Sequence, residues 1–415
     1  MNLKSLKPLA KKIEIFLVIF YLFYFLIPGL APPPFDPVFK ALSYPIVGIL
    51  IIGQWKRFMY VSTMDILILV LIVLCLTSQL WSAAPNYTSN EVKALVRSTL
   101  FGAYLATRFS LKEQMQLWSW VLGSTAVLCL IFGINPINTA WTGIYGYKNH
   151  LARIMVFTAI LFLAKIYKRG KAFWLYAFLS ALAIILIILS QAKSCYIIMT
   201  IMLILFPLYK LTSIGYKSKT LLLLTSLIIS GISIALLLQN LEIFLVDILG
   251  KDLTFNGRTQ IWELMFDKVW QRPWTGYGFA AFWTSDESSY ILQYSWARGA
   301  KDFRFNSHNS YMEILLQIGI PGLVLYLINY LTVLLRSITL FNSTFEIEDR
   351  ITLFWVIQNL VAMFLLAWAD SGGVLSNDSI WSFYVSIALT IAVYYKRLRN
   401  KQAIFQLDKR ISTQV

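Results

Sequence analysis

Runs of about 20 mostly apolar residues recur along nearly the whole chain, and a run of that length crosses a lipid bilayer as a helix. Hydrophobic residues make up 58% of the 415 residues and charged residues only 13%, which excludes an ordinary soluble domain. We therefore predict an all-α polytopic membrane protein. Its spans, about twelve in number, are expected at residues 13–30, 38–54, 64–83, 91–107, 114–133, 150–167, 172–190, 194–210, 220–239, 314–335, 350–369 and 379–395.

The basic residues of the short loops predict the orientation of the spans. Lys and Arg precede the first span and then fall at every second boundary between spans. Because such loops stay in the cytoplasm, we expect both termini to be cytoplasmic. The first span follows a basic segment but is too long for a signal peptide and has no small-residue cleavage site. We therefore expect it to remain uncleaved.

Composition also argues against nucleic-acid binding and against a disulfide or zinc site. The net charge of +16 comes largely from scattered loop clusters that form no single surface, so nucleic acid is not an expected partner. The three cysteines, Cys75, Cys129 and Cys195, lie in or beside apolar spans without a CxxC motif. They are interpreted as small core residues, so neither disulfides nor a zinc site is expected.

One loop on the outer side, at about residues 240–308, is much longer than the other connections, and loops of that length usually have a function. We therefore divide the chain into residues 1–239 with nine spans, the loop 240–308, and residues 309–415 with three spans and a cytoplasmic tail. Within the loop, NGRTQIWELMFDKVWQRP predicts an amphipathic helix that begins near Asn256, ends at Arg272 and lies on the membrane surface.

The segment PWTGYGFAAFW that follows this helix is a Pro/Gly turn rich in aromatic rings. Such a turn suits packing over a site or stacking on the faces of sugars. On periodicity alone, a simple interfacial anchor is the alternative interpretation of the helix and its turn.

His308 is one of only two histidines in the chain, and it lies in a polar stretch directly before an apolar helix. Its neighbours Arg298, Lys301 and Arg304 are basic on the outer side, where basic residues are uncommon. They indicate an anionic ligand or a carboxylate partner. Two alternatives stay open: the basic residues form a solvated face with carboxylates of the same loop, or His308 caps the helix that starts at Asn309.

Other cationic side chains are expected at the same leaflet. Lys93 and Arg97, four residues apart, share a helix face near the outer end of the fourth span, and Lys193 lies in the outer turn SQAKS. Long cationic side chains reach the interface by snorkelling, which accounts for Lys93 better than for Arg97.

The segment GRTQIWELMFDKVWQRPWTGYGFAAFW, followed by SHNSYMEILLQIGIPGL, resembles the O-antigen ligase and polymerase superfamily, especially its exopolysaccharide-polymerase branch. GYKNHLARIM at residues 146–155 is also similar to that family. The resemblance implies a GT-C-like, metal-independent, inverting glycosyltransferase of the bacterial inner membrane, with its active site at the periplasmic face and no cofactor. Such enzymes move a glycan from undecaprenyl pyrophosphate to a sugar hydroxyl.

The resemblance leaves the acceptor open. It is lipid A-core in ligases, a lipid-linked repeat unit in polymerases, and protein in the O-oligosaccharyltransferases of the superfamily. The residues of the loop motif, GRTQIW and GYGFAAFW, favour a polymerase. The expected partners are the lipid-linked donor, the acceptor, the bilayer and other polysaccharide export proteins.

Residue by residue, the resemblance implies His308 as the catalytic base and Arg258 as a ligand of the donor pyrophosphate. Lys193 falls where the family has an arginine, so the charge is kept and the bidentate fork is lost. Arg97 and Arg304 are further candidates for the pyrophosphate. The candidates for the substrate pocket are Asn149, His150, Tyr277, Arg298, Asn309 and Glu313.

A transporter or flippase of the same lipid-linked glycan is the competing class. Such proteins usually show repeated halves and charges around a midplane cavity. This chain shows no convincing internal repeat, and its polarity is concentrated in one outer loop.

Overall fold

The computed structural model describes residues 3–27, 29–32, 34–133, 140–167, 170–206, 258–295, 305–344 and 346–412, and all of its regular elements are helices. The all-helical prediction is therefore confirmed. The elements are α1 (Leu3–Leu26), α2 (Phe35–Ile52), α3 (Trp55–Ser62), α4 (Ile66–Thr77), η1 (Ser78–Trp81), α5 (Pro85–Arg108), α6 (Leu111–Ile131), η2 (Gly143–Tyr145), α7 (Lys148–Ile166), α8 (Phe173–Ser190), α9 (Lys193–Leu205), α11 (Arg258–Gln271), η5 (Phe282–Thr284), η6 (Asp286–Ser288), α12 (Ser289–Tyr294), α13 (Ser310–Ser343), α14 (Ile347–Ala369) and α15 (Ser379–Ser412).

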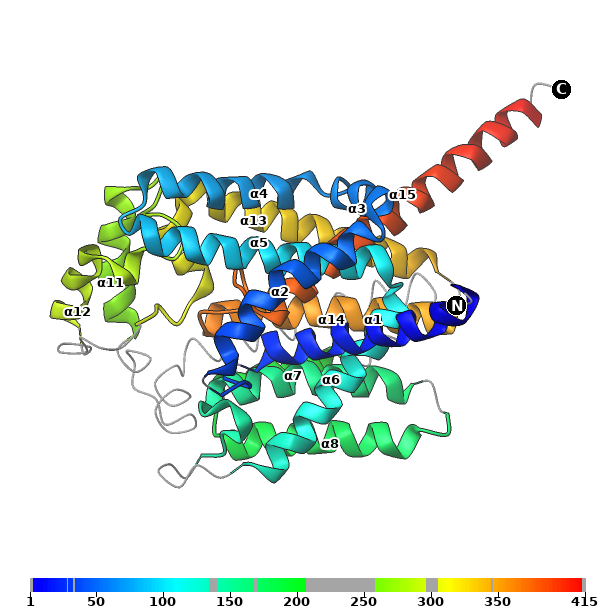
Figure 1. Ribbon diagram of the computed structural model, residues 1–415, viewed down its shortest axis with the longest axis horizontal. Coiled ribbons are helices and arrows are strands. Elements are labelled where there is room, and N and C mark those ends of the chain that lie inside the picture. The colour runs from blue at the N-terminus through cyan, green and yellow to red at the C-terminus, as the bar shows by residue number, and fades with distance from the viewer. Residues whose placement is uncertain are drawn as a thin grey trace, which may run out of the picture.

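Most of the long helices run side by side in one bundle (Figure 1). Close pairs include α7 with α8, α5 with α15, and α13 with α14. The N-terminus and the far part of α15 lie at one end, which we call the terminal end. Helices α11 and α12 lie at the opposite end, the loop end. The two ends of the bundle therefore carry different parts of the chain.

The bundle has the composition of a membrane domain. Among the described residues, six helices are long and apolar enough to cross a bilayer: α2, α6, α7, α8, α13 and α14. The number is seven if the helices Trp55–Ser62 and Ile66–Trp81, which meet at an angle of 90°, count together as one span. The predicted runs at 13–30, 91–107, 194–210 and 379–395 also overlap helices, and 220–239 lies outside the described residues. The total of about twelve spans stays a prediction.

The three cysteines are buried and unpaired, as predicted. Large apolar side chains such as Trp174, 79% exposed, and Ile204, 68% exposed, face outward from the bundle. Exposed apolar surface of this kind is expected where lipid is the solvent, because lipid tails solvate it without cost.

Helix α13 is broken near its start, at Ile318 and at Gly319, which has φ 70°. The turn PWTGYG fills this break and hydrogen-bonds the backbone groups that the broken helix leaves free. Three bonds join the two segments: Tyr277 N to Leu316 O at 2.7 Å, Gly278 N to Gln317 O at 2.9 Å, and Ile320 N to Pro273 O at 2.7 Å. The two halves of the sequence motif are therefore parts of one packed unit.

Two glycines make this packing unit sterically feasible. Gly276 has φ 61°, and a Cβ there would lie 2.6 Å from Gln317 C. A Cβ on Gly319 would lie 2.7 Å from Pro273 O. Any side chain at either position would push the turn away from α13.

Helix α11 packs against α13 and ends where the sequence predicted, at Gln271 just before Arg272 and Pro273. Its buried face consists of Ile261, Met265 and Val269. Phe266 and Trp270, two aromatic residues of the same helix, are 46% and 69% exposed. The predicted N-cap, Asn256, lies outside the described residues.

Candidate active site

His308 lies at the start of α13, in a backbone conformation that few residues adopt. Its φ is 52°, and its N–H donates to Asn306 Oδ1 at 3.0 Å. The next residue caps the helix, because Asn309 Oδ1 accepts from Tyr311 N at 2.9 Å and from Met312 N at 3.3 Å. The cap belongs to Asn309, so the interpretation of His308 as a helix cap is wrong. The left-handed backbone costs about 1–2 kcal/mol, and such strain clusters at functional sites.

Glu313 holds the segment before His308 in place. One of its carboxylate oxygens accepts from Ser307 N at 2.7 Å and from Trp283 Nε1 at 2.9 Å. On the other side of the same segment, Trp262 Nε1 donates to Ser307 O at 2.9 Å. The carboxylate of Glu313, a predicted pocket residue, therefore supports the segment before His308 by binding the backbone N–H of that segment.

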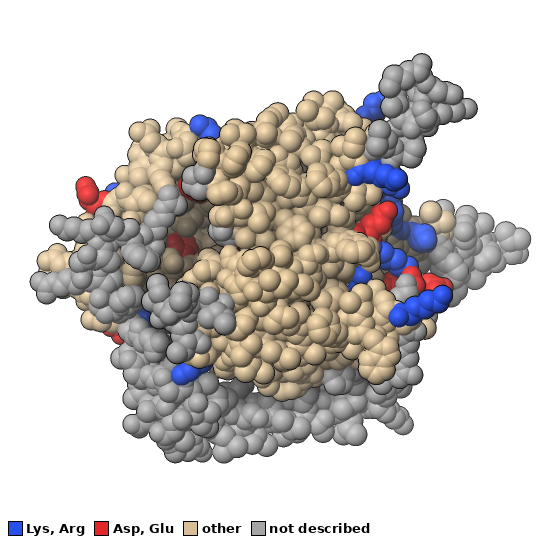
Figure 2. All heavy atoms as spheres, turned by 60° about the horizontal axis from the view of Figure 1, so that its bottom comes forward, with Lys and Arg blue, Asp and Glu red and all other residues tan. Residues whose placement is uncertain are grey.

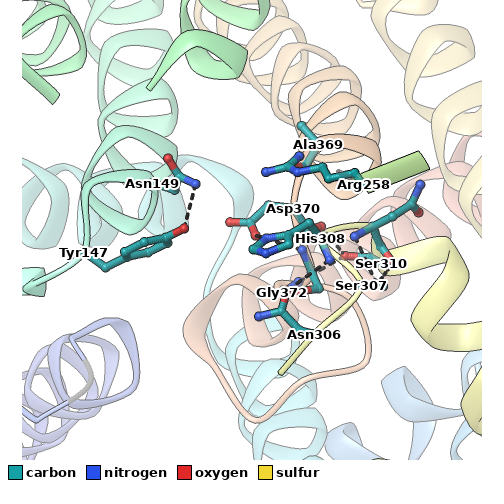
Figure 3. Close-up of polar contacts among 12 residues, drawn as sticks. Tyr147, Asn149, Arg258, Asn306, Ser307, His308, Ser310, Ala369, Asp370 and Gly372 are labelled. Carbon is teal, nitrogen blue, oxygen red and sulfur yellow. Dashed lines mark hydrogen bonds and ion pairs between the residues drawn. The ribbon is translucent and has the colours of Figure 1, made fainter. Parts of the chain in front are cut away.

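Asp370 faces His308 from the end of α14 (Figure 3). Its Oδ1 lies 3.9 Å from His308 Nδ1, and its Oδ2 lies 3.9 Å from Nη1 of Arg153 on α7. Both distances are too long for hydrogen bonds, but the charged Arg153 guanidinium attracts the carboxylate strongly, and the imidazole of His308 does so once it is protonated. Burial raises the pKa of the Asp370 carboxyl, but His308 and Arg153 outweigh it and hold that pKa below its ordinary value. Asp370 is therefore a carboxylate at neutral pH.

The short loop after α14 is tied to the start of α13. Ser310 Oγ donates to Asp370 O at 2.9 Å and accepts from Gly372 N at 3.1 Å. Gly372 also leaves room for Arg153, because a Cβ there would lie 2.6 Å from Arg153 Nη1. The hydroxyl of Ser310 and the missing side chain of Gly372 thus set the positions of Asp370 and Arg153.

Arg258, the first residue of α11, reaches the same place. Its Nη1 donates to Ala369 O at 2.9 Å, directly before Asp370. Burial lowers the pKa of Arg258 and outweighs the opposing charge of Asp370, but an arginine this basic stays protonated. Tyr147 and Asn149, joined by a hydrogen bond of 3.1 Å, face Asp370 from the start of α7 (Figure 3).

His150 belongs to the surroundings of this cluster. His150 lies on α7 one turn before Arg153 and acts electrostatically on Asp370. Lys193 is the first residue of α9, which packs against α7 and α14. Beneath the cluster lies a cavity of about 40 Å³, lined by Phe25, Leu26, Tyr145, His150, Arg153, Ile154, Asp378, Ser379 and Ile380.

Arg97 has a different environment. Its guanidinium lies 4.7 Å from the ring centroid of Phe25 and 4.8 Å from that of Tyr44, and its Nη1 donates to Ser43 Oγ at 3.0 Å. The side chain is buried among α1, α2 and α5, and no contact in the described structure joins it to His308.

Tyr277 is also used in packing. Its hydroxyl donates to Lys268 O at 2.9 Å, inside the small core of the loop, and burial raises its pKa to about 12. Glu287, which the solvated-face alternative would pair with the arginines of the loop, lies 2.9 Å from Lys268 and 3.3 Å from Arg272. Arg298 and Arg304 lie outside the described residues.

Sequence reasoning did not single out Asp370, Arg153 or Ser310. A signal for Arg153 was present, because an arginine inside an apolar span is a functional candidate by default, and it lies three residues after His150. Asp370 begins the polar loop DSGGVLSND, but nothing in the sequence indicates which histidine it faces. In the part of the chain that the structure describes, no group of three or more His, Cys, Asp or Glu side chains is arranged to hold a metal ion.

The arrangement combines a proton acceptor with buried positive charge. The imidazole of His308 has a carboxylate beside Nδ1, Arg153 lies beside the other oxygen of that carboxylate, and Arg258 binds the backbone of the preceding residue. Such a site is suited to removing a proton from a hydroxyl and to binding an anionic group.

Comparison with known proteins supports the resemblance seen in the motifs. Residues 178–327 match the profile of a family described as O-antigen ligase. The chain is also 23% identical over 297 residues to the exopolysaccharide production protein ExoQ of Rhizobium meliloti (strain 1021). That alignment covers 66% of this chain and 64% of the relative, so the chain spans less than two thirds of the relative's length. The resemblance to the O-antigen ligase and polymerase superfamily is thus confirmed.

The family match includes part of the cluster only. Lys193, Arg258 and His308 lie inside residues 178–327, whereas Arg153 and Asp370 lie outside. The fold brings these two residues to the matched segment.

Proposed function

We propose that this protein is a glycosyltransferase that moves a glycan from undecaprenyl pyrophosphate to a sugar hydroxyl during surface polysaccharide biosynthesis. The observation that carries the proposal is the meeting of His308, Asp370, Arg153 and Arg258, from four separate elements, at the loop end of a helical membrane bundle. The family match and the exopolysaccharide relative support the same chemistry.

We propose further that the loop end is periplasmic and that the chain crosses the inner membrane about twelve times. Basic side chains gather at the terminal end of the molecule (Figure 2), and basic residues are retained in the cytoplasm. The cluster around His308 would then face the compartment where lipid-linked glycans are assembled into polymer.

In the proposed reaction, His308 acts as the general base in a single displacement. Asp370 orients the ring by attracting an Nδ1 proton, which leaves Nε2 free to accept one. The acceptor oxygen forms a bond to the anomeric carbon while the bond from that carbon to the pyrophosphate oxygen breaks. The hydroxyl proton ends on His308, undecaprenyl pyrophosphate leaves, and the configuration at the anomeric carbon is inverted.

The pyrophosphate gains negative charge as it leaves, and cations beside the reacting atoms stabilise that charge. Arg258 uses Nη1 for Ala369 O and has further N–H groups to offer. Arg153 is 8% exposed, and its Nε and Nη1 have no hydrogen-bond partner in the described structure. We assign both arginines and Lys193 to the pyrophosphate.

For the acceptor, we propose another lipid-linked repeat unit, which makes the protein a polysaccharide polymerase. The similarity to an exopolysaccharide production protein favours this acceptor over lipid A-core or protein. A deletion strain separates the three. Loss of long-chain exopolysaccharide with intact lipopolysaccharide is expected, whereas lipopolysaccharide that stops at the core would identify a ligase.

The central experiment measures glycan transfer by purified protein in detergent, where no membrane has to be crossed. His308→Ala is expected to reduce the rate by about 10²–10⁴ while the fold is kept. His150→Ala is the comparison, because these are the only two histidines and the larger loss identifies the base. Near-full activity of folded His308→Ala would exclude this mechanism, and wild-type protein that binds donor without transferring it would favour a transporter.

A further inference from the structure

A second polar site lies at the terminal end, far from the His308 cluster. It is a cavity of about 490 Å³ between the start of α6, the end of α13, the start of α14 and the outer part of α15. Pockets for small ligands usually measure about 300–1,000 Å³, so the size is adequate. The lining residues are Ser110, Leu111, Lys112, Leu340, Thr344, Asp349, Thr352, Leu353, Tyr394, Arg397, Leu398 and Lys401.

Positive charge dominates the rim of this cavity. Lys112, Arg397 and Lys401 line it, against the single carboxylate of Asp349. Lys112 is neutralised, because its Nζ lies 2.9 Å from Asp349 and 3.5 Å from Glu348. No ion pair involves Arg397 or Lys401 within the described ranges. These two cations are therefore available to a ligand.

Arg397 and Lys401 reach the cavity because of their spacing on α15. They are four residues apart, so they share one face of the helix with Tyr394 and Leu398. Arg399, on the same helix, is exposed and does not line the cavity.

The floor of the cavity is apolar. Leu111, Leu340 and Leu353 are 3%, 6% and 5% exposed, and all three line the cavity. A cationic rim above an apolar floor suits a molecule with one anionic group and one less polar part. Basic pockets between membrane helices on the cytoplasmic side bind the headgroups of anionic lipids by this combination.

We propose that this cavity binds a phosphate ester, with the phosphate between Arg397 and Lys401 and the attached group over the leucine floor. Two sources share this chemistry: the headgroup of an anionic phospholipid and a free phosphate ester of the cytoplasm. The site lies at the opposite end of the bundle from His308, and its occupation does not depend on the reaction proposed there.

The test uses full-length protein in detergent, titrated by calorimetry with dihexanoyl phosphatidylglycerol, dihexanoyl phosphatidylcholine and glycerol phosphate. A Lys or Arg near an anionic headgroup strengthens binding roughly five-fold, so Arg397→Gln should weaken phosphatidylglycerol binding by about that factor. The double variant Arg397→Gln, Lys401→Gln should weaken it roughly 25-fold. Arg399→Gln is the matched control and should change it less than two-fold.

The ligands also distinguish the two sources. Tighter binding of phosphatidylglycerol than of glycerol phosphate assigns the site to lipid, and equal affinity assigns it to free phosphate esters. Thermal unfolding with and without ligand gives a second measurement, because a ligand of the folded state raises the midpoint. The proposal is overturned if wild type binds neither anion, if phosphatidylcholine binds as tightly as phosphatidylglycerol, or if Arg399→Gln weakens binding as much as Arg397→Gln.

Discussion

Asp370→Asn is the most informative single change, because the carboxylate adjoins both the candidate base and a buried arginine. Each of its oxygens lies 3.9 Å from a nitrogen, one of His308 and one of Arg153. Unit charges at that distance interact by about 4 kcal/mol at an effective dielectric constant of about 20. Because Arg153 would remain buried without a counterion, we expect Asp370→Asn to lower the free energy of unfolding by about 3–5 kcal/mol.

Transfer should fall for a separate reason. Without the carboxylate, nothing in the described structure holds a proton on His308 Nδ1, and the ring loses its preferred tautomer. A loss on the order of 10²-fold in rate is expected, bounded by the loss in His308→Ala.

The double variant Arg153→Met, Asp370→Asn separates the two effects. Removing both charges of a buried pair is often nearly neutral for stability, so thermal unfolding in detergent should return toward wild type. Transfer, measured at equal concentrations of folded protein, should stay low. If the double variant regains transfer together with stability, Asp370 serves only to neutralise Arg153, and Arg153 is not needed for the pyrophosphate. Wild-type rates in folded Asp370→Asn would refute the orienting role altogether.

Three further predictions use the same assays. Arg258→Lys should keep part of the donor affinity and Arg258→Ala should lose most of it, because the guanidinium fork of arginine, which also binds Ala369 O, suits a pyrophosphate. Equal, unimpaired donor affinity in both variants would exclude the assignment of Arg258 to the pyrophosphate. Gly276→Ala should cost at least about 1–2 kcal/mol for its left-handed backbone and should also lower transfer. Gly48→Ala, inside α2 with nothing within 4 Å of its added Cβ, should lower neither stability nor transfer. The depressed pKa of Asp370 means that its stabilising contribution is complete above the ordinary carboxyl pKa of 3.8 and disappears as pH falls through the lower folded value. Acid titration of unfolding should therefore be flat from about pH 5 to 8 for this group and should show a steeper loss below about pH 4 in wild type than in Asp370→Asn.

Local physical chemistry made much of the helical fold predictable. The expected runs at 150–167, 172–190 and 350–369 correspond to α7 (Lys148–Ile166), α8 (Phe173–Ser190) and α14 (Ile347–Ala369). A helix in lipid satisfies its own backbone, so an apolar run of sufficient length determines its structure without reference to the rest of the chain.

The candidate site was predictable only in part. His308 was noticeable because histidine is rare in this chain and because the motifs resemble a known family. Tyr277 and Glu313 belong to the same motifs, and only their contacts show that they pack and brace the loop.

The sequence by itself determined that this protein is a helical membrane protein and singled out the polar loop that contains His308. The tertiary structure decided which side chains meet there, since Asp370, Arg153 and Arg258 come from helices far apart in the chain. The physical reason is that helix ends in a membrane are brought together by packing between whole helices. Apolar length and periodicity specify each helix separately and carry no information about which ends will be neighbours.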